Sequence, residues 1–477
     1  MKSRIQQEAL VYHRVADRIE GLITAGTFRP GDRLPSVRSL SRDWRVSVTT
    51  AVGAYSLLED RGFVEPRSRS GYYVRARRLS PERLPRQIEV EGDPVEVGCA
   101  EITEKIMDAS ATPGIVPFGA AVPADEILPS ARLALLYSSV VRSAGAMAHQ
   151  YSMPPGLQGL RVELAKRLLG SGITVSPEEI IATSGAIDAV LLAVKSVCEA
   201  GDVVAVESPT YFGILSMVRE LGLKVVEIPV FADRGVCTRA LEEAFTTHPV
   251  KACILQPNYH NPVGSVMPDV EKKRAVALAK RHGVTLIEDD LYGDLHFSEK
   301  RPLSLKAFDP GDTVIHCGSY SKSLAPGLRV GWIVPGKRHH RIKSLKYATS
   351  LANATASEMV VAEFLKSGGV ERHLRKVRRI YARQTHEIRE AILGSFPAGI
   401  RVTQPEGGFL LWCQMPDGFD AEAFALAALK RKISVVPGTL FSASCGLRNF
   451  FRISCGFPLD DRSRRAIGIL AKLAEGQ

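Results

Sequence analysis

The sequence predicts an α/β protein that carries a small, helical and basic segment at its N-terminus. The chain has 477 residues, 45% of them hydrophobic and 24% charged, which is the balance of a globular protein with room for several domains. From Phe118 onward, short apolar runs rich in β-branched residues alternate with segments of helix length, as at 203–206, 252–255 and 285–287. Strands of this kind are buried on both faces of a mostly parallel sheet.

The composition indicates the cellular compartment in which we expect the protein to work. No run of about 18 apolar residues could span a membrane, and no apolar signal-peptide segment follows Met1. A cytoplasmic protein without a membrane partner is therefore expected. The eight cysteines contain no C-x-x-C pair, so we expect reduced thiols rather than a disulfide framework, and no metal site.

The positive charge is concentrated near the N-terminus. The formal net charge is +11, and residues 1–78 carry 15 Lys and Arg against 8 Asp and Glu. A basic head on a nearly neutral body favours a polyanion as the partner of the head. The alternative is a basic surface that is merely solvated, and charge alone leaves both interpretations open.

Three helices are predicted in the N-terminal segment. Residues 10–25 place apolar side chains three and four positions apart, which is typical of an amphipathic helix. A second helix is predicted over 36–44 with Ser36 as its N-cap, and a third over 48–60 with Ser47 as its N-cap.

A basic hairpin is predicted after these helices. Two short β runs, 63–66 and 72–74, flank the polar tip 67–71. Three helices followed by a hairpin is the order of a winged helix-turn-helix, whose third helix enters the major groove of DNA. The alternative is a small helical protein–protein module. In the DNA-binding interpretation, arginines hold phosphates and the first turn of the third helix lies nearest the bases. The candidate DNA contacts are Arg33, Ser36, Arg38, Arg45, Ser47, Val48, Thr49, Thr50, Arg67 and Arg69.

A local motif links this segment to a known family. Residues 30–40, Pro-Gly-Asp-Arg-Leu-Pro-Ser-Val-Arg-Ser-Leu, resemble the signature of GntR-type winged-helix transcription regulators, and the similarity extends over about residues 10–75. The resemblance implies binding to double-stranded operator DNA. Many relatives carry Arg or Asn early in the recognition helix, whereas this chain has Val48 and Thr49. Base readout is therefore expected to rely on methyl contacts and hydroxyls.

Three parts are expected along the chain. We predict a DNA-binding domain over 1–77, a linker over 78–112 and an effector domain over 113–477. The linker range is rich in Arg, Glu, Pro and Gly, and a helix is predicted within it over 96–109.

One cluster in the larger part of the chain carries reactive residue types. Gly-Ser-Tyr-Ser-Lys-Ser at 318–323 precedes Gly-Leu-Arg-Val-Gly-Trp at 327–332. Lys322, flanked by hydroxyls, can form an imine while its neighbours and Arg329 hold a phosphate. The alternative is a surface lysine and a buried, ion-paired arginine. The sequence Ser184-Gly185-Ala186 opens a helix after a strand, which suits a phosphate on backbone N–H groups.

Three further positions agree with a flat, phosphorylated ring. Asp289 ends a strand and can keep a pyridine nitrogen protonated, although an N-cap is the simpler role. Asn261 can hydrogen-bond a phenolic oxygen, but Asn-Pro is also an ordinary turn. Tyr211 can stack on a ring or can be a core tyrosine.

Together these motifs resemble, in order, the fold type I (aspartate aminotransferase-like) enzymes over about residues 113–475. The resemblance implies a PLP-dependent transferase fold, with a large mostly parallel-sheet domain and a smaller α+β domain. It implies pyridoxal 5′-phosphate held as an internal aldimine on Lys322. Ile187 stands where many relatives have Gln, so one phosphate contact is expected to be missing. The implied ring contacts are Asp289, Asn261, Tyr292 and Tyr211; the implied phosphate contacts are Ser319, Ser321, Arg329, Gly185, Ala186 and, from a neighbouring subunit, Tyr151; the implied carboxylate contact is Arg452.

The combination of the two parts resembles the MocR subfamily of bacterial regulators over the whole chain. It implies a PLP-dependent transcription regulator whose body senses a small amino-group effector by aldimine exchange at Lys322. It also implies a head-to-tail homodimer, which would present two heads to two half-sites. The alternative is a catalytically active aminotransferase with an appended DNA-binding domain, since no catalytic residue is missing.

Overall fold

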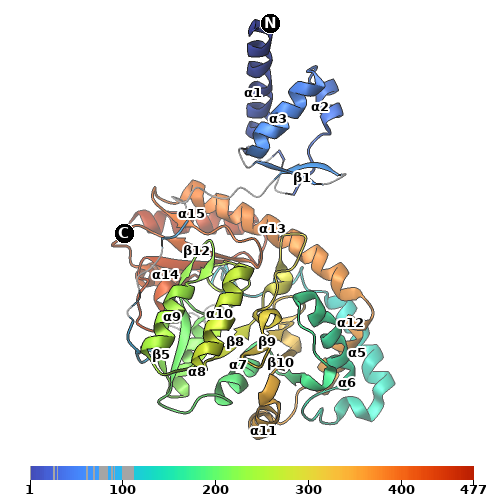
Figure 1. Cartoon of the computed structure of the whole chain (residues 1–477), viewed down its shortest axis with the longest axis vertical. Coiled ribbons are helices and arrows are strands. Elements are labelled where there is room, and N and C mark those ends of the chain that lie inside the picture. The colour runs from blue at the N-terminus through green and yellow to red at the C-terminus, as the bar shows by residue number, and fades with distance from the viewer. Residues whose placement is uncertain are drawn as a thin grey trace. The chain divides into compact units, whose positions relative to one another are not determined.

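The computed structural model describes residues 2–24, 27–28, 31–60, 63–67, 70–74, 84–86, 90, 92–98 and 112–476. The chain divides into two compact units, Met1–Pro81 and Glu82–Gln477 (Figure 1). Among the described residues, no helix has the length and apolar character that crossing a bilayer requires.

The N-terminal unit contains three helices followed by a two-stranded antiparallel sheet (Figure 1). The first helix begins well before the predicted start at Leu10, because residues 6–9 are good helix formers. Ile19, Leu40 and Tyr55 are buried in the small core of the unit. The elements are α1 (Lys2–Thr24), α2 (Val37–Asp43), α3 (Val48–Asp60), β1 (Val64–Arg67) and β2 (Gly71–Val74).

Serine side chains fix the starts of the second and third helices. Ser36 Oγ accepts a hydrogen bond from the Ser39 N–H at 3.1 Å, and Ser47 Oγ accepts one from the Thr50 N–H at 3.0 Å. Each bond satisfies a backbone donor that the helix itself leaves unpaired. Both serines therefore act as the predicted N-caps.

The body is built on an eight-stranded sheet with the order β3-β10-β9-β8-β7-β4-β5-β6. The strands from β9 to β5 are parallel, while β10 and β6 pair antiparallel with their neighbours. The strands are β3 (Ile181–Thr183), β4 (Val203–Ser208), β5 (Lys224–Phe231), β6 (Gly235–Val236), β7 (Val250–Leu255), β8 (Thr285–Asp289), β9 (Val314–Ser319) and β10 (Gly331–Val334).

Helices cover both faces of this sheet, as the apolar strands predict. Alternate residues of β4 separate the two faces: Val204 and Val206 belong to one apolar cluster, Val203 and Ala205 to another. The α-helices of this region are α5 (Ser130–Ala144), α6 (Gln158–Leu168), α7 (Ala186–Lys195), α8 (Phe212–Glu220), α9 (Thr238–Thr247), α10 (Asp269–His282), α11 (His339–Thr349) and α12 (Thr355–Lys366). Short 3₁₀ helices connect several elements: η2 (Gly145–His149), η3 (Leu169–Ser171), η4 (Pro177–Glu179), η5 (Gly293–Leu295), η6 (Leu305–Phe308), η7 (Pro326–Leu328), η8 (Gly336–Arg338) and η9 (Gly438–Phe441).

A smaller α+β part follows at the C-terminal end of the body. Its four-stranded antiparallel sheet has the order β11-β12-β14-β13. The predicted fold class, α/β with a large mostly parallel sheet and a smaller α+β part, is confirmed. The elements are α13 (Gly369–Ser395), β11 (Arg401–Val402), β12 (Leu410–Gln414), α14 (Ala421–Lys430), β13 (Val436–Pro437), β14 (Phe450–Ser454) and α15 (Asp461–Glu475).

Part of the predicted linker packs on the body. Val95 forms an antiparallel bridge with Val225 of β5, and the Gly98 N–H donates to the Ala443 carbonyl at 3.2 Å. The helix predicted from Glu96 therefore does not begin there, because contacts with the sheet override the local pattern. The range 99–109 of that helix lies outside the described residues.

Among the cysteines that the structure describes, one departs from the expectation of reduced thiols. Cys445 is in a disulfide, so the prediction is wrong at this position. The expectation rested on spacing along the chain, whereas a disulfide needs only proximity in space. Six other cysteines are free thiols: Cys198, Cys237, Cys253, Cys317, Cys413 and Cys455.

Candidate functional sites

The loop after β9 places Lys322 inside the body. Its Nζ donates a hydrogen bond to the Ala121 carbonyl oxygen at 2.6 Å. Burial, together with the positive charges of Arg452 and Arg329, lowers the pKa of Lys322 to about 8, while the charge of Asp289 acts in the opposite direction. A lysine with this pKa is partly a neutral amine near neutral pH, which is the form that attacks a carbonyl carbon.

Next to this lysine, the start of α7 and two strand ends form an anion-binding arrangement. Arg329 donates Nη1 to Ser321 Oγ at 3.2 Å and Nη2 to the Ser184 carbonyl at 2.8 Å. Ser319 Oγ lies 2.8 Å from Ser321 Oγ. Gly185 has a φ of 94°, and an added Cβ would lie 2.6 Å from Arg329 Nη2, so a side chain there would strain the backbone and displace the Arg329 guanidinium. A guanidinium, two hydroxyls and a helix N-terminus together suit a phosphate.

The first two residues of α7, which follow its N-cap Gly185, differ in exposure. Ala186, the first residue of α7, is buried, and its backbone belongs to the helix N-terminus described above. Ile187 is 42% exposed. An isoleucine side chain donates no hydrogen bond, so this position adds no polar contact to the anion-binding arrangement.

Asp289 ends β8 and is buried. Its Oδ2 accepts a hydrogen bond from Gln256 Nε2 at 2.5 Å, and its Oδ1 has no partner among the described residues. Burial raises the pKa of Asp289 to about 6, and the charges of Asp290 and Glu207 add to this, while the Gln256 bond opposes it. Gln256 was missed by the sequence analysis, although its place directly after β7 was a usable signal, since ligands gather at the carboxyl ends of parallel strands.

Arg452 of β14 lies against the same region. Its Nη1 donates to Asn261 Oδ1 at 3.0 Å and its Nη2 to the Gly119 carbonyl at 2.6 Å, while its Nε has no described partner. Burial lowers the pKa of Arg452 to about 10. Asn261 thus uses its amide oxygen for Arg452 and keeps its amide nitrogen as a donor.

The three predicted tyrosine contacts differ in burial: Tyr292 is buried, Tyr211 is half-buried and Tyr151 is exposed. Tyr292 is buried with its hydroxyl unpartnered among the described residues, and burial raises the pKa of both Tyr292 and Tyr211. Tyr151 is 75% exposed. Its predicted role requires a second subunit, and so it stays a prediction.

A cluster of two acidic residues and a histidine at the end of β8 already has its charges balanced by neighbouring groups. Single ligand atoms of Glu288, Asp290 and His316 lie within 4.8 Å of one another. Asp290, however, pairs with Arg301, and Glu288 accepts hydrogen bonds from the Leu305 N–H at 2.8 Å and from His316 at 3.0 Å. Burial alone would raise the pKa of Glu288, but its hydrogen bond and charge interaction with His316 lower it to about 2. These contacts give the cluster a structural role.

In the N-terminal unit, the first turn of α3 is partly open to solvent. Val48 is 54% exposed, and Thr49 is exposed beside it. Thr50, by contrast, is only 7% exposed, and its hydroxyl lies 2.7 Å from Ser47 Oγ. Thr50 and Ser47 therefore serve the helix cap, and the surface of the turn comes from Val48 and Thr49.

The arginines predicted to contact DNA differ in solvent exposure and in their contacts within the N-terminal unit. Arg38 and Arg45 are exposed. Arg33 is exposed and lies beside Gly71 of the hairpin. Arg67 pairs with Glu65 at 3.1 Å and lies over the Tyr73 ring. Arg69 lies outside the described residues.

Known proteins match both units. Residues 113–467 match the family described as Aminotransferase class I and II, and residues 11–74 match the bacterial regulatory proteins of the gntR family. The chain is 39% identical to "Uncharacterized HTH-type transcriptional regulator YjiR" of Escherichia coli, over 96% of this chain and 97% of that protein.

Solved structures match the body. A kynurenine aminotransferase of Pyrococcus horikoshii has a TM-score of 0.74 and 28% identity, covering 80% of this chain and 95% of that one. A second match is LysN, the α-aminoadipate aminotransferase of Thermus thermophilus, complexed with N-(5′-phosphopyridoxyl)-L-leucine. It has a TM-score of 0.71 and 30% identity, and the match covers 79% of this chain and 95% of that one. The predicted fusion of two known domains is confirmed. This chain belongs to the class I and II aminotransferase family and is a GntR-type regulator, in which a gntR-family helix-turn-helix domain precedes an aminotransferase-like domain.

Proposed function

We propose that this protein is a pyridoxal-phosphate-dependent transcription regulator. Its N-terminal unit binds double-stranded operator DNA, and its body holds the cofactor on Lys322 and senses a small amino-group effector. The observation that carries the proposal is the half-buried amine of Lys322 beside an anion-binding arrangement, in a chain whose residues 11–74 match the gntR family.

The buried cluster fits the chemical groups of pyridoxal phosphate. Asp289 Oδ1 and the Tyr292 hydroxyl are buried polar atoms without a described partner, and such atoms usually have one in native proteins. A ring nitrogen and a ring oxygen would supply these partners. The residues that would hold the phosphate are Gly185, Ala186, Ser319, Ser321 and Arg329. The phosphopyridoxyl ligand named for LysN supports this assignment.

Each residue has a separate task at this site. Pyridoxal phosphate, when bound, supplies an aldehyde that condenses with primary amines and a ring that withdraws electrons. Lys322 provides the neutral amine, and Asp289 holds a proton at the ring nitrogen. Arg329 and the N-terminus of α7 neutralise the phosphate. Tyr211 provides a flat surface for the ring.

Arg452 supports an effector that carries a carboxylate as well as an amine. Its guanidinium is buried, and its Nε has no described partner. A planar guanidinium suits a carboxylate, which can accept two parallel hydrogen bonds. The effector can change DNA binding only if it favours one arrangement of the heads over another.

A head-to-tail homodimer is part of the proposal. Tyr151 is exposed, as a side chain that contacts a second subunit's phosphate needs to be before assembly. A dimer would present two heads, and the exposed Val48 and Thr49 of each would read one half-site through methyl and hydroxyl contacts.

DNA binding by the full chain tests the proposal. Duplexes from the region upstream of its gene are compared with shuffled duplexes of the same length, with and without pyridoxal phosphate. We expect a sequence-specific shift in at least one of the two states. Equal binding to both duplexes in both states would refute the proposed function.

Aminotransfer is the second candidate function. The favouring observation is that the pKa of Lys322 is lowered to about 8 in the electrostatic environment of the buried Asp289 and Arg452. Multiple turnovers of amino donor and oxoacid, followed in the cofactor absorbance, test it. A rate of roughly 1 s⁻¹ or above, the ordinary enzyme range, would favour catalysis over sensing.

A further inference from the structure

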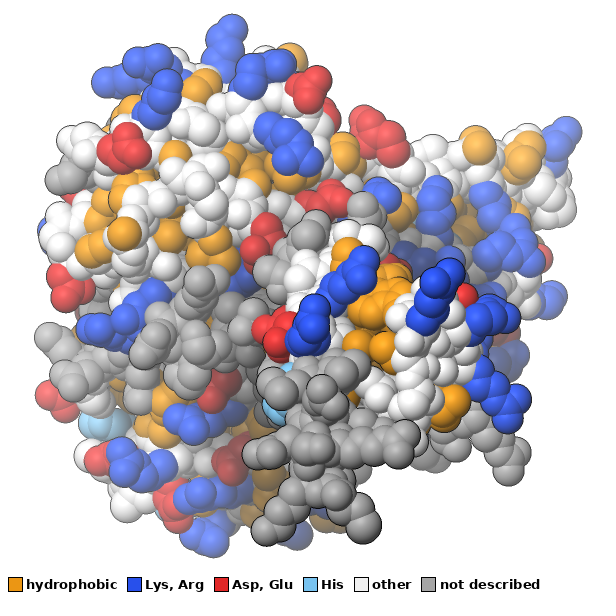
Figure 2. Space-filling model, turned by 90° about the horizontal axis from the view of Figure 1, so that it is seen from above, with side chains coloured by type: hydrophobic (Ala, Val, Ile, Leu, Met, Phe, Trp, Pro, Cys, Tyr) orange, Lys and Arg blue, Asp and Glu red, His pale blue; other side chains and the backbone are white. Residues whose placement is uncertain are grey.

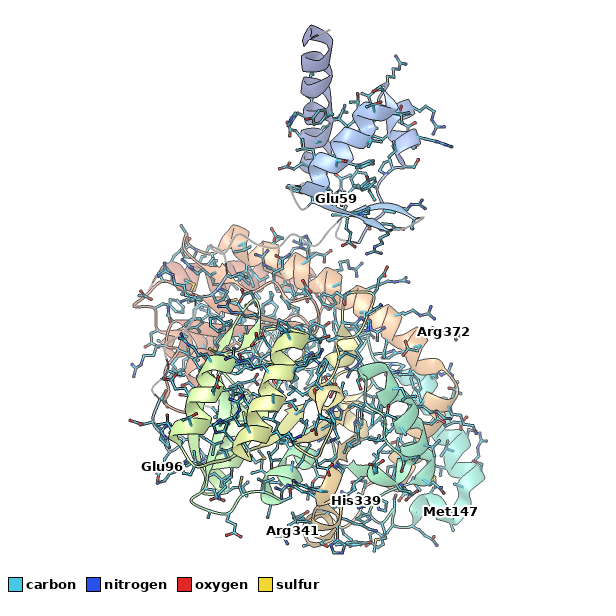
Figure 3. The ribbon with its side chains drawn as sticks, viewed as in Figure 1. Glu59, Glu96, Met147, His339, Arg341 and Arg372 are labelled. Carbon is cyan, nitrogen blue, oxygen red and sulfur yellow. The ribbon has the colours of Figure 1, made fainter. Side chains whose placement is uncertain are left out.

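The outward side of α13 carries a row of positive charge that the proposed function does not use. Arg372, Lys376, Arg379 and Arg383 follow one another at helical spacings of four, three and four residues, and all four are exposed. From first to last they extend over about 16 Å, at about 1.5 Å per residue. We call these four residues the α13 basic face. Arg372 is labelled on α13 in Figure 3.

The charges of the α13 basic face have no described counter-charge. None of its four side chains forms an ion pair with a described residue. Two other arginines of the same helix are engaged: Arg378 Nε donates to the Asp294 carbonyl at 2.7 Å, and Arg389 pairs with Glu390 at 2.6 Å. Like charges four residues apart repel on a helix. An external polyanion would remove that repulsion.

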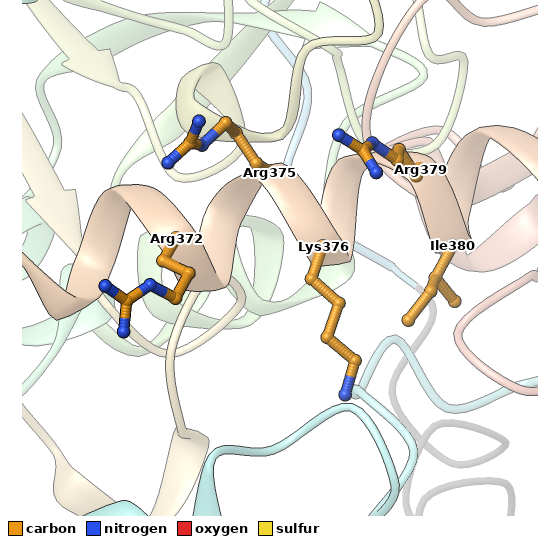
Figure 4. Close-up of a pocket in the computed structure, with 5 residues that line it drawn as sticks. All are labelled: Arg372, Arg375, Lys376, Arg379 and Ile380. Atoms are coloured by element: carbon orange, nitrogen blue, oxygen red, sulfur yellow. The ribbon is translucent and has the colours of Figure 1, made fainter.

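The surface around these residues suits phosphate groups. Arg372, Arg375, Lys376, Arg379 and Ile380 line a surface hollow of about 400 Å³. In the view of Figure 4 the side chains of Arg375 and Arg379 project upward from the helix, and those of Lys376 and Ile380 project downward. Among the described residues, the lining holds four cations, no acid and no aromatic ring. Guanidinium groups bind phosphates with two parallel hydrogen bonds, so this lining favours phosphates over cations or flat apolar ligands.

The extent of the face favours a polymer over a single phosphorylated molecule. Double-stranded DNA carries one negative charge per about 1.7 Å of helix axis, so a stretch of about 16 Å presents several phosphates. In the view of Figure 2, Lys and Arg side chains outnumber Asp and Glu side chains over the side of the molecule that is seen, in agreement with the net charge of +11.

We propose that the α13 basic face binds the phosphate backbone of duplex DNA and adds sequence-independent affinity to that of the N-terminal unit. The inference rests on the proposed function, because DNA held by the head is tethered to the body at high effective concentration. The body then does more than sense an effector: it forms part of the DNA-binding surface.

The salt dependence of DNA binding tests this assignment. The test variant of the full chain combines Arg372→Gln, Lys376→Gln and Arg379→Gln. The control variant removes the same charge from exposed positions of α10 and α15 by Lys280→Gln, Arg464→Gln and Arg465→Gln. Dissociation constants for an upstream duplex and a shuffled duplex are measured by fluorescence anisotropy over a series of salt concentrations. Thermal unfolding of each variant checks that the body is folded.

We expect the test variant to bind both duplexes about 10-fold or more weakly at low salt. The slope of log K against log salt should fall by about 2 to 3, as loss of three phosphate contacts predicts. The ratio of the dissociation constants for the upstream and the shuffled duplex should be unchanged. The control variant should bind both duplexes as tightly as the wild type does. Unchanged affinity and slope in the test variant, or an equal loss in the control, would overturn the assignment. If the wild type does not distinguish the duplexes, the proposed function fails, while the slopes still decide the role of the face.

Discussion

The half-buried Lys322 and the buried Arg452 interact electrostatically, although they lie 130 positions apart in the sequence. Lys322 Nζ donates to the Ala121 carbonyl at 2.6 Å, and the positive charge of Arg452 disfavours a second positive charge on that amine. Arg452 therefore has two effects in the proposed site. It can hold a carboxylate, and it helps to keep Lys322 in its reactive, neutral form.

The first prediction concerns the pH dependence of cofactor capture. Below a pH of about 8 the amine of Lys322 is mostly protonated, and above that pH it is mostly neutral. The rate at which Lys322 captures pyridoxal phosphate should therefore rise as the pH passes through this value. Arg452→Gln removes a positive charge and should move the midpoint to higher pH. The exposed Arg448→Gln is the control and should leave it in place. Visible absorbance after mixing with pyridoxal phosphate gives the rate at each pH. A midpoint near 10.5 in the wild type, the ordinary lysine value, would contradict the burial argument.

The second prediction concerns the phosphate-binding backbone. Gly185→Ala introduces a Cβ that would lie 2.6 Å from Arg329 Nη2, and so it should weaken pyridoxal phosphate binding by about 10-fold or more. Gly201→Ala is a matched control, because Gly201 also has a positive φ but nothing lies within 4 Å of its added Cβ. Both variants should lose about 1–2 kcal/mol of stability through backbone strain. Spectroscopic titration of the cofactor separates the two, and equal affinities would argue against the Gly185 assignment.

The third prediction concerns acid stability. Burial alone would raise the pKa of Asp294, but the charges of Arg167 and Arg301 outweigh it and hold the pKa well below its usual range. A carboxylate of this kind stabilises the fold above its unfolded pKa of about 3.8, and the contribution is lost as pH falls below that value. Asp294→Asn should cost about 3 kcal/mol at pH 7, because two largely buried guanidinium groups, those of Arg167 and Arg301, lose a partner.

Urea unfolding of three proteins checks the acid-stability prediction. Asp233→Asn, whose carboxylate is exposed, should change stability by about 0.5 kcal/mol or less. The Asp294→Asn variant should also lose less stability than the wild type between pH 5 and pH 3. If the free energy of unfolding falls with pH in parallel for the wild type and Asp294→Asn, the ionisation of Asp294 contributes nothing to acid stability.

The fourth prediction separates phosphate from base contacts in the head. Arg38→Ala should weaken binding to all duplexes alike and lower the salt slope by about 1, as a phosphate contact does. Thr49→Val keeps the shape of an exposed side chain but removes its hydroxyl. It should change the preference among duplexes and leave the slope unaltered. Competition binding at several salt concentrations distinguishes the two, and an unchanged slope for Arg38→Ala would indicate a structural role.

Local patterns were sufficient for several parts of the structure. The start of α3 at Val48 follows from Ser47, a cap that acts within one turn, and the start of α7 at Ala186 follows from the predicted strand-to-helix turn at Ser184-Gly185-Ala186. Lys322 and Arg329 lie close in sequence, so one motif was enough to predict both as neighbours of one site.

Contacts between distant segments could not be predicted in the same way. The hydrogen bond from Gln256 to Asp289 joins the ends of two strands, and the bridge from Val95 to Val225 replaces a helix that the local pattern favoured. The burial of Thr50 depends on which side of α3 packs inward. Each of these facts is set by tertiary packing, which spacing along one chain does not reveal.

Communication between the cofactor site and the DNA-binding head is tested most directly by one pair of binding constants. The dissociation constant of the full chain for its upstream duplex is measured with and without saturating pyridoxal phosphate, in the wild type and in Lys322→Ala. We predict a change of about 5-fold or more in the wild type, the lower range of allosteric coupling, and none in the variant. Identical constants with and without the cofactor in the wild type would contradict the account.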